Sequence, residues 1–305
     1  MRIVRPIALA LACAALTAGC GQSATTSGGA GRKVIGVTLL TATDSFYKTL
    51  EASIREEAAA KGLDVIVVAC EMDPAKQASQ IEDFVARHVS AILAAPCDSN
   101  AIVPALAGAE RAGIPVFTAD IAAHGGKVVS HVASDNVQGG RLAAQALAGF
   151  MNGKGEVLII DQPTVASVQD RVRGFEEGLT AFPDIKVVAK LSADGQRARA
   201  AQIMEDTLQA HRTVTGVFGI NDNMALGAAG VIEAAGRKDI AVVGYDASDE
   251  AQTAIKKGGP LKADVIQYPD QIGRAAIDVI AQYLAGQTVP PLKAVNVGIW
   301  DGKSK

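Results

Sequence analysis

Nine polar and aromatic residues stand at or just after the ends of apolar runs along the chain. They are Asp44, Phe46, Tyr47, Asp120, Arg171, Asn221, Tyr245, Asp246 and Gln267. Carboxylates accept hydrogen bonds from hydroxyl groups, arginine and asparagine donate them in fixed planar geometry, and aromatic faces cover the C–H side of a sugar ring. Aromatic residues make up only 4% of the chain, so three of them in this set favour a binding role. The residue types predict a site for a molecule that carries several hydroxyl groups.

Each of these residues also has a plainer explanation. A carboxylate or asparagine that follows a strand is usually the N-cap of the next helix, which fits Asp44 and Asn221. Phe46 fits equally well as the first core residue of a helix, and Arg171 as a solvated charge. Carboxylates after three different strands, together with an arginine and three aromatic residues, form a stronger pattern than any one of them.

The elements that must position these residues are short apolar runs separated by helix-length amphipathic segments. The runs are 34–40, 64–70, 91–96, 114–120, 128–133, 156–161, 185–191, 216–220, 240–246 and 263–267. Their near-continuous hydrophobicity is typical of parallel strands that are covered on both faces by helices. The stretch "SHVASDNVQGG" at 130–140 closes one series and opens a second. We therefore expect two α/β units, with ligands held outside the carboxyl ends of the strands.

The N-terminus indicates export. Residues 1–19 combine Arg2 and Arg5 with an apolar run that is too short to cross a bilayer, as in a signal peptide. The junction "LTAGC" resembles the bacterial lipobox, in which the cysteine is lipidated after cleavage, so Cys20 is the expected lipid attachment site. The segment 20–32 is rich in glycine, serine and threonine, and we expect a flexible tether. An ordinary cleaved signal peptide with an incidental cysteine is the alternative.

Composition argues against several classes of protein. Loss of Arg2 and Arg5 with residues 1–19 moves the formal charge from −3 to −5. The sequence carries no basic stripe of the kind that binds phosphate backbones, so we expect no nucleic-acid partner. A serine-elbow motif, a glycine-rich phosphate loop and metal-ligand histidine spacing are not found, so we expect neither an enzyme nor a cofactor nor a bound metal.

Two cysteines remain after Cys13 and Cys20 are set aside. Cys70 and Cys97 each follow a predicted strand, and an oxidising compartment could pair them. The first strand of the sheet should lie between their strands, which would place them beyond the separation that a disulfide tolerates. The sequence leaves their pairing open, with free thiols favoured.

Five segments together resemble the type I periplasmic binding proteins of the ribose-binding subfamily, the solute receptors of sugar ABC transporters. They are "SHVASDNVQGG" at 130–140, "DRVRGFEEGL" at 170–179, "FGINDNMALGA" at 218–228, "VVGYDASDE" at 242–250 and "IQYPDQIG" at 266–273. The resemblance covers the mature chain from about Lys33. It implies two Rossmann-like lobes joined by three crossovers, with 33–134 plus 268–296 in the first lobe and 135–267 plus 297–305 in the second. The hinge residues that it implies are Ser134, Asp135, Gln267, Tyr268, Asn296 and Val297.

The same resemblance places all nine residues of the opening set in a sugar pocket. Three positions depart from the ribose-binding pattern: Ile121 replaces an arginine, Asp44 an asparagine and Gly195 a phenylalanine. We expect Gly195 to open the pocket wall and the ligand to be a neutral hexose or inositol rather than ribose. The implied partner is an ABC transporter permease, reached by a monomer anchored through lipid at the periplasmic or cell surface. A receptor for ribose or another pentose, or one serving chemotaxis or autoinducer sensing, is the alternative. A transcriptional regulator on this fold would need an N-terminal helix-turn-helix, where this chain has a signal peptide.

Overall fold

The computed structural model describes residues 32–303, so the predicted signal peptide, Cys20 and most of the tether lie outside the described residues. All the described residues belong to one compact unit. None of the helices in this part of the chain has the length and hydropathy needed to span a bilayer.

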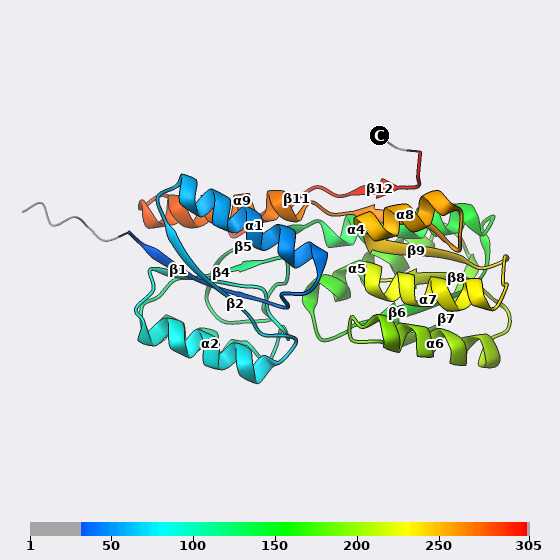
Figure 1. Ribbon diagram of the computed structural model, residues 1–305, viewed down its shortest axis with the longest axis horizontal. Helices are drawn as coiled ribbons and strands as arrows, with labels where there is room; N and C mark the ends of the chain where they lie inside the picture. The colour runs from blue at the N-terminus through cyan, green and yellow to red at the C-terminus, as the bar shows by residue number, and fades with distance from the viewer. Residues whose placement is uncertain (1–31, 304–305) are drawn as a thin grey trace, which may run out of the picture. The chain divides into compact units, whose positions relative to one another are not determined.

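Two six-stranded sheets form the framework (Figure 1). The first sheet has the order β2-β1-β3-β4-β5-β11, and the second has the equivalent order β7-β6-β8-β9-β10-β12. The strands of the first sheet are β1 (Val34–Leu39), β2 (Asp64–Ala69), β3 (Ala91–Ala94), β4 (Val116–Ala119), β5 (Val128–Ser134) and β11 (Leu292–Val295). Those of the second are β6 (Lys154–Asp161), β7 (Asp184–Ser192), β8 (Val214–Gly219), β9 (Ala241–Asp246), β10 (Leu261–Ile266) and β12 (Gly298–Trp300).

Nine helices in the described part of the chain cover the faces of these sheets. They are α1 (Ser45–Ala60), α2 (Pro74–Ala86), α3 (Val103–Arg111), α4 (Asn136–Phe150), α5 (Ala166–Leu179), α6 (Arg197–Ala210), α7 (Asp222–Ala234), α8 (Asp249–Lys257) and α9 (Pro269–Leu284). Helices α1 and α9 pack together on one face of the first sheet and α2 and α3 on the other. Helices α4 and α5 pair on the second sheet, and α6 and α7 form another pair. We call each sheet with its helices a lobe, first and second in chain order.

The sequence predicted the first ten strands, and the structure places a strand in each of those runs. It did not predict β11 and β12, which are only four and three residues long. One pairing departs from the expected parallel arrangement, because β12 runs antiparallel to β10. Strands such as β3 and β4 are buried on both faces, as the continuous runs indicated.

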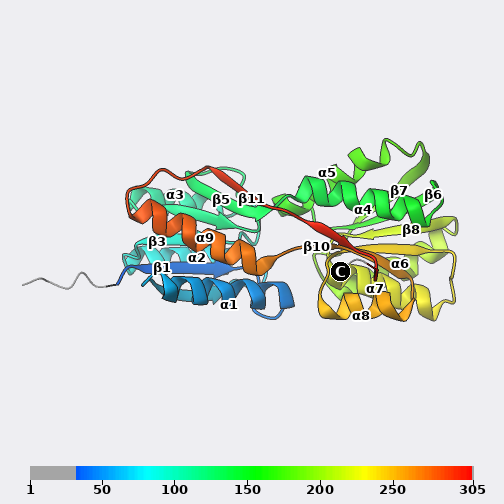
Figure 2. The same cartoon turned by 90° about the horizontal axis from the view of Figure 1, so that it is seen from above.

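The chain passes between the sheets three times: after β5, after β10 and between β11 and β12 (Figure 2). Local chemistry marks two of these passages. Asp135 caps α4 by accepting a hydrogen bond from the Gln138 amide at 3.0 Å. Pro269 occupies the first turn of α9, where its missing N–H costs nothing. The three passages contain the residues that the sequence placed at the hinge.

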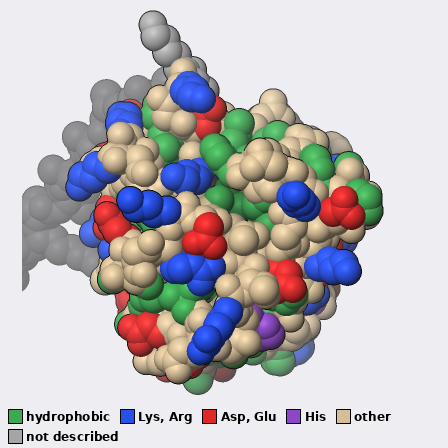
Figure 3. Space-filling view, turned by 90° about the vertical axis from the view of Figure 1, so that its right-hand side faces the viewer, with side chains coloured by type: hydrophobic (Ala, Val, Ile, Leu, Met, Phe, Trp, Pro, Cys, Tyr) green, Lys and Arg blue, Asp and Glu red, His purple; other side chains and the backbone are tan. Residues whose placement is uncertain are grey.

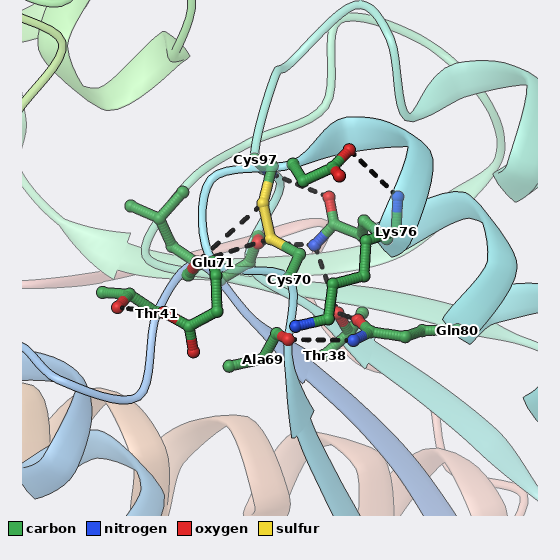
Figure 4. The surroundings of a disulfide bond; sticks show 12 residues. Thr38, Thr41, Ala69, Cys70, Glu71, Lys76, Gln80 and Cys97 are labelled. Atoms are coloured by element: carbon green, nitrogen blue, oxygen red, sulfur yellow. Dashed lines mark hydrogen bonds between the residues drawn. A yellow bond between two sulfur atoms is a disulfide. The ribbon is translucent and has the colours of Figure 1, made fainter.

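The favoured interpretation of the remaining cysteines was wrong, because Cys70 and Cys97 form a disulfide (Figure 4). Strand β1 does lie between β2 and β3. However, both cysteines stand beyond the ends of their strands, and the chain after β1 leaves room for the bridge. Their Cα atoms are 6.8 Å apart, and the Leu40 carbonyl oxygen lies 3.4 Å from the Cys70 sulfur.

Candidate functional site

A cavity of about 360 Å³ lies between the carboxyl ends of the two sheets and is lined by both lobes. This volume is within the roughly 300–1,000 Å³ of small-molecule sites. Eight of the nine residues singled out in the sequence line it: Asp44, Phe46, Tyr47, Asp120, Arg171, Asn221, Asp246 and Gln267.

The start of α1 supplies three residues of the first-lobe wall. Asp44 is the N-cap, because its Oδ1 accepts a hydrogen bond from the Phe46 amide at 2.8 Å. Its Oδ2 accepts another from Asn223 Nδ2 of the second lobe at 3.0 Å. The rings of Phe46 and Tyr47 meet edge to face, with centroids 5.3 Å apart. Phe46 belongs to the core and also lines the cavity, so its two interpretations are compatible.

Asp120 follows β4 in a left-handed conformation, with φ at 64°. Its Oδ2 accepts a hydrogen bond of 2.6 Å from the Tyr47 hydroxyl. Its Oδ1 is buried and has no donor among the described residues. Burial raises the pKa of Asp120, and the nearby Arg171 charge opposes that rise. Burial also raises the pKa of Tyr47, as does the charge of Asp120, so the phenol stays protonated and donates.

Arg171 is the central cation of the second-lobe wall, and it is buried rather than solvated. Its Nε donates to Asn136 Oδ1 at 2.9 Å, and its Nη1 donates to the Ile220 carbonyl oxygen at 2.8 Å. The same Nη1 lies 3.9 Å from Asp246 Oδ1. These contacts hold the planar guanidinium in one orientation at the cavity.

Tyr245 is the one member of the set that does not line the cavity. It is completely buried, and its ring lies behind Arg171, whose guanidinium carbon is 3.9 Å from the ring centroid. Its hydroxyl donates to Asn136 Oδ1 at 3.2 Å. Successive side chains of a strand point to opposite faces, so Tyr245 and Asp246 cannot both face the ligand. Tyr245 therefore does not lie where it could stack on a sugar ring, and its ring packs against the guanidinium of Arg171 instead.

Asp246 ends β9 and faces the cavity beside Gln267. Its Oδ1 accepts a hydrogen bond from Gln267 Nε2 at 2.7 Å. Burial raises the pKa of Asp246 well above its ordinary value, against the opposing charge of Arg171. The Oε1 atom of Gln267 is buried without a donor among the described residues. Asn221 caps α7 through Oδ1, which accepts from the Met224 amide at 2.9 Å and leaves the Asn221 amide nitrogen as a donor.

Several residues that line the cavity were not predicted from the sequence, among them Met72, Gln162 and the ion pair of Arg197 with Glu250. Gln162 directly follows β6 and Met72 closely follows β2, so the rule that strand ends carry the site could have found both. Gly195 does not leave an open wall. A Cβ atom placed there would lie 2.9 Å from Gln162 Oε1 and 3.5 Å from Met72 Cε, so these two side chains fill the place.

Electrostatically, the site is rich in hydrogen-bond acceptors. Asp44, Asp120, Asp222 and Asp246 line the cavity together with Arg171, while Arg197 is bound bidentately by Glu250 at 2.8 and 2.7 Å. Acceptors that outnumber free cationic donors match a ligand with many hydroxyl protons.

Comparison with known proteins agrees with this geometry. The sequence profile of the periplasmic binding protein domain family matches residues 35–288. The ribose import binding protein of Bacillus subtilis is 38% identical over 84% of this chain and 83% of its own. A solute binding protein from Bacillus halodurans C-125 with bound myo-inositol superposes with a TM-score of 0.84 at 28% identity, covering 91% of this chain and 97% of that one. Another, from Agrobacterium vitis with bound α-D-tagatopyranose, has a TM-score of 0.84 and 28% identity, covering 89% and 95%.

This family consists of extracytoplasmic transport receptors and not of enzymes. The match spans both lobes, and the similar structures carry their ligands as solute receptors. The chain therefore belongs to the type I periplasmic binding proteins, as a sugar-binding solute receptor of an ABC transporter.

Proposed function

We propose that the cavity binds a neutral monosaccharide or cyclic polyol, a hexose or inositol in preference to ribose. The observation that carries this proposal is a pair of buried acceptor atoms at the cavity wall, Asp120 Oδ1 and Gln267 Oε1, which have no donor among the described residues. A buried acceptor without a donor costs roughly 1–3 kcal/mol, and ligand hydroxyl groups would remove that cost.

The charge balance supports a neutral ligand. Asp120, Asp246 and Asp44 would repel a phosphate or carboxylate group, and Arg171 already carries three contacts. Ile121 lines the cavity where ribose-binding relatives place an arginine, which removes a donor to ring or hydroxyl oxygens. These features favour a different hydroxyl pattern from that of ribose.

Ribose is the second candidate, because a relative at 38% identity is a ribose import binding protein. A thermal-shift screen of ribose, D-tagatose and myo-inositol separates the two. A ligand at 100 times its dissociation constant should add about 2.7 kcal/mol of stability. Stabilisation by ribose beyond that by the other two would overturn the preference for a hexose or inositol.

The lobes, with the boundaries predicted above, are proposed to close over the ligand about the three crossovers. Contacts across the cavity support this proposal. Besides the bond between Asn223 and Asp44, the Ala166 amide donates to Ser99 Oγ at 2.9 Å and the Ser99 amide to the Thr164 carbonyl oxygen at 3.0 Å. A ligand that touches both lobes shifts an open–closed equilibrium toward the closed form. Small-angle scattering should show a smaller radius of gyration with ligand.

Delivery to an ABC permease by a monomer anchored through lipid on Cys20 completes the proposal. The lipobox-like junction and the tether are its support. Replacing Cys20 with alanine should release the protein from the membrane or block its maturation. A wild-type protein that is fully soluble in the extracytoplasmic fraction would contradict the anchor.

A further inference from the structure

Two carboxyl groups of the second lobe, that of Asp222 at the cavity wall and that of Asp264 behind it, lie close together. Asp264 is completely buried on β10, and Asp222 is nearly so at the first turn of α7. The two carboxyl groups accept hydrogen bonds from consecutive backbone amides, those of Ala247 and Ser248, which places them next to one another. Asp222 Oδ1 and Asp264 Oδ2 are buried and have no donor among the described residues. Two buried carboxylates in contact would repel, so the pair is stable only with one proton between them.

The surroundings decide which residue carries that proton. Asp222 lies at the N-terminus of α7, where the helix dipole favours a negative charge. Asp264 lies within the sheet on β10 and, unlike Asp222, is not itself part of the first turn of a helix. Burial and then the charge of Asp222 raise the pKa of Asp264 well above its ordinary value, whereas the hydrogen bond to Asp264 opposes the rise at Asp222. Asp264 is therefore the neutral acid and Asp222 the carboxylate.

The pair also holds the turn between β9 and α8. Asp264 Oδ1 accepts a hydrogen bond from the Ala247 amide at 3.0 Å, and Asp222 Oδ2 accepts one from the Ser248 amide at 2.7 Å. The turn is strained, because Asp246 has a φ of 114° and Ala247 a φ of 53°. Residues in such conformations persist only where their surroundings fix them.

Gly244 makes room for this arrangement. It is the register partner of Asp264 on the neighbouring strand, and a Cβ atom there would collide with Asp264 Oδ2. The Asp264 side chain thus extends over β9 toward the turn. The lack of a side chain at Gly244 therefore lets Asp264 reach the Ala247 amide in the turn after β9.

We propose that the Asp222–Asp264 pair is a proton-dependent positioning device that fixes the strained turn and thereby presents Asp246 to the sugar. The inference rests on the proposed function in one respect, the contact of Asp246 with ligand. Asp222 lines the cavity, whereas Asp264 and Ala247 do not, so Asp264 acts on the site through Asp222 and through the turn.

Several other charges act on the pair. Asp246 on β9 and Asp44 at the start of α1 are negative and disfavour a second charge on it. Arg197 on α6 lies close enough to interact with Asp222, but Glu250 on α8 already neutralises it. Arg171 on α5 acts on Asp246 and Asp120. No cation among the described residues bonds to the pair itself.

The dependence on pH follows from the raised pKa. An unfolded Asp264 loses its proton at the ordinary carboxyl pKa, whereas the folded one keeps it to higher pH. Stability should therefore fall as pH rises from the ordinary carboxyl range through the raised pKa, because unfolding releases a proton there. The turn should loosen over the same range, and sugar affinity should fall with it.

The ligand-free test compares Asp264→Asn, Asp264→Leu and Asp184→Asn across acidic, neutral and alkaline pH. Asparagine imitates the neutral acid, since its oxygen accepts from Ala247 and its amide donates to Asp222. The melting temperature of Asp264→Asn should fall less with rising pH than that of wild type, because only the contributions of other buried acids such as Asp246 remain, whereas the exposed Asp184→Asn on β7 should keep the full fall. Carboxyl carbon NMR of wild type should show, besides the raised titration of Asp246, a second high-titrating aspartate signal that is absent from Asp264→Asn. Equal pH slopes in wild type and Asp264→Asn would overturn the proposal.

The second arm measures affinity for whichever of ribose, D-tagatose and myo-inositol stabilises wild type most. Asp264→Leu should weaken binding tenfold or more, and Asp264→Asn should restore it to within about threefold and abolish its alkaline decline. Equal loss in both variants would show a packing role only and overturn the positioning role. If none of the three probes binds wild type, the proposed function fails, while the ligand-free arm still decides whether the pair shares a proton.

Discussion

The two walls of the cavity are built by different physical means. On the first lobe, Asp44 caps α1, Tyr47 donates to Asp120, and a disulfide ties the loops after β2 and β3. On the second lobe, Arg171 and Asp246 belong to a buried network of charged and polar side chains that extends to β10. The first wall should therefore respond to changes in covalent and loop structure, and the second to changes in charge and pH.

The surface of the second lobe differs from its cavity wall, where carboxylates outnumber free cations. On the end face shown in Figure 3, lysine and arginine side chains are interspersed with aspartate and glutamate. Exposed pairs such as Arg141 with Glu177 contribute little to stability, typically about 0.2–1 kcal/mol. The buried network around Arg171 is where electrostatics should control binding.

Loss of Arg171 should have the largest effect. Arg171→Ala strands Asp246 and removes the donor to the Ile220 carbonyl oxygen, so stability should fall by roughly 3–5 kcal/mol, as for other broken buried pairs. Sugar affinity should fall by at least about 2 kcal/mol. Thermal unfolding and calorimetry measure the two effects. Arg141→Ala, which removes an exposed arginine, is the control, and a similar small effect of both substitutions would contradict the buried role of Arg171.

The disulfide should have the next largest effect, on stability. Its cysteines are 27 residues apart, and removing a cross-link of that loop length should cost roughly 3 kcal/mol. The double substitution Cys70→Ser with Cys97→Ser should lower the free energy of unfolding by that amount, which denaturant titration measures as a lower midpoint. It should also weaken sugar binding modestly, because Met72 and the Glu71 carboxylate that holds Thr41 belong to the same loops. Unchanged stability on reduction would show that the first wall does not depend on the bridge.

Asp120 tests the acceptor side of the first wall. Asp120→Asn can still accept from Tyr47 but can turn an amide donor toward the cavity, so affinity should fall by about 2 kcal/mol. Tyr47→Phe keeps the ring and loses the hydrogen bond to Asp120, so the binding free energy should weaken by about 1 kcal/mol. Because burial raises the pKa of Asp120, acidification should protonate it and weaken binding in wild type. The acid decline should be reduced in Asp120→Asn; if it is unchanged, another group causes it.

Tyr245 should give the smallest effect. Tyr245→Phe keeps the ring behind Arg171 and loses the bond to Asn136, so stability should fall by about 1 kcal/mol and affinity by less than threefold. A large loss of affinity with unchanged stability would restore the idea that Tyr245 itself contacts the sugar.

Most of the strands and the positions of the site could be predicted because both follow from simple rules. Continuous apolar runs mark buried parallel strands, and residues after such strands collect at one edge of the sheet. Both Tyr245 and Asp246 were predicted to lie in the pocket, but only Asp246 lines the cavity, because the side chains at the end of one strand point in opposite directions. Free thiols were predicted because β1 lies between the strands of the two cysteines. Strand order does not show where the chain runs after β1, and there the two cysteines meet beyond the strand ends. The role of Asp264 was missed because a lone acid in an apolar run gives no sign of the helix terminus and turn that it reaches.

Titration calorimetry of the mature protein with neutral and anionic sugars of similar size tests the central claim most directly. The acceptor-rich cavity predicts that myo-inositol or a neutral hexose binds, and that the corresponding uronate or sugar phosphate binds at least tenfold more weakly. An anionic sugar that binds more tightly than its neutral counterpart would contradict the account of the cavity.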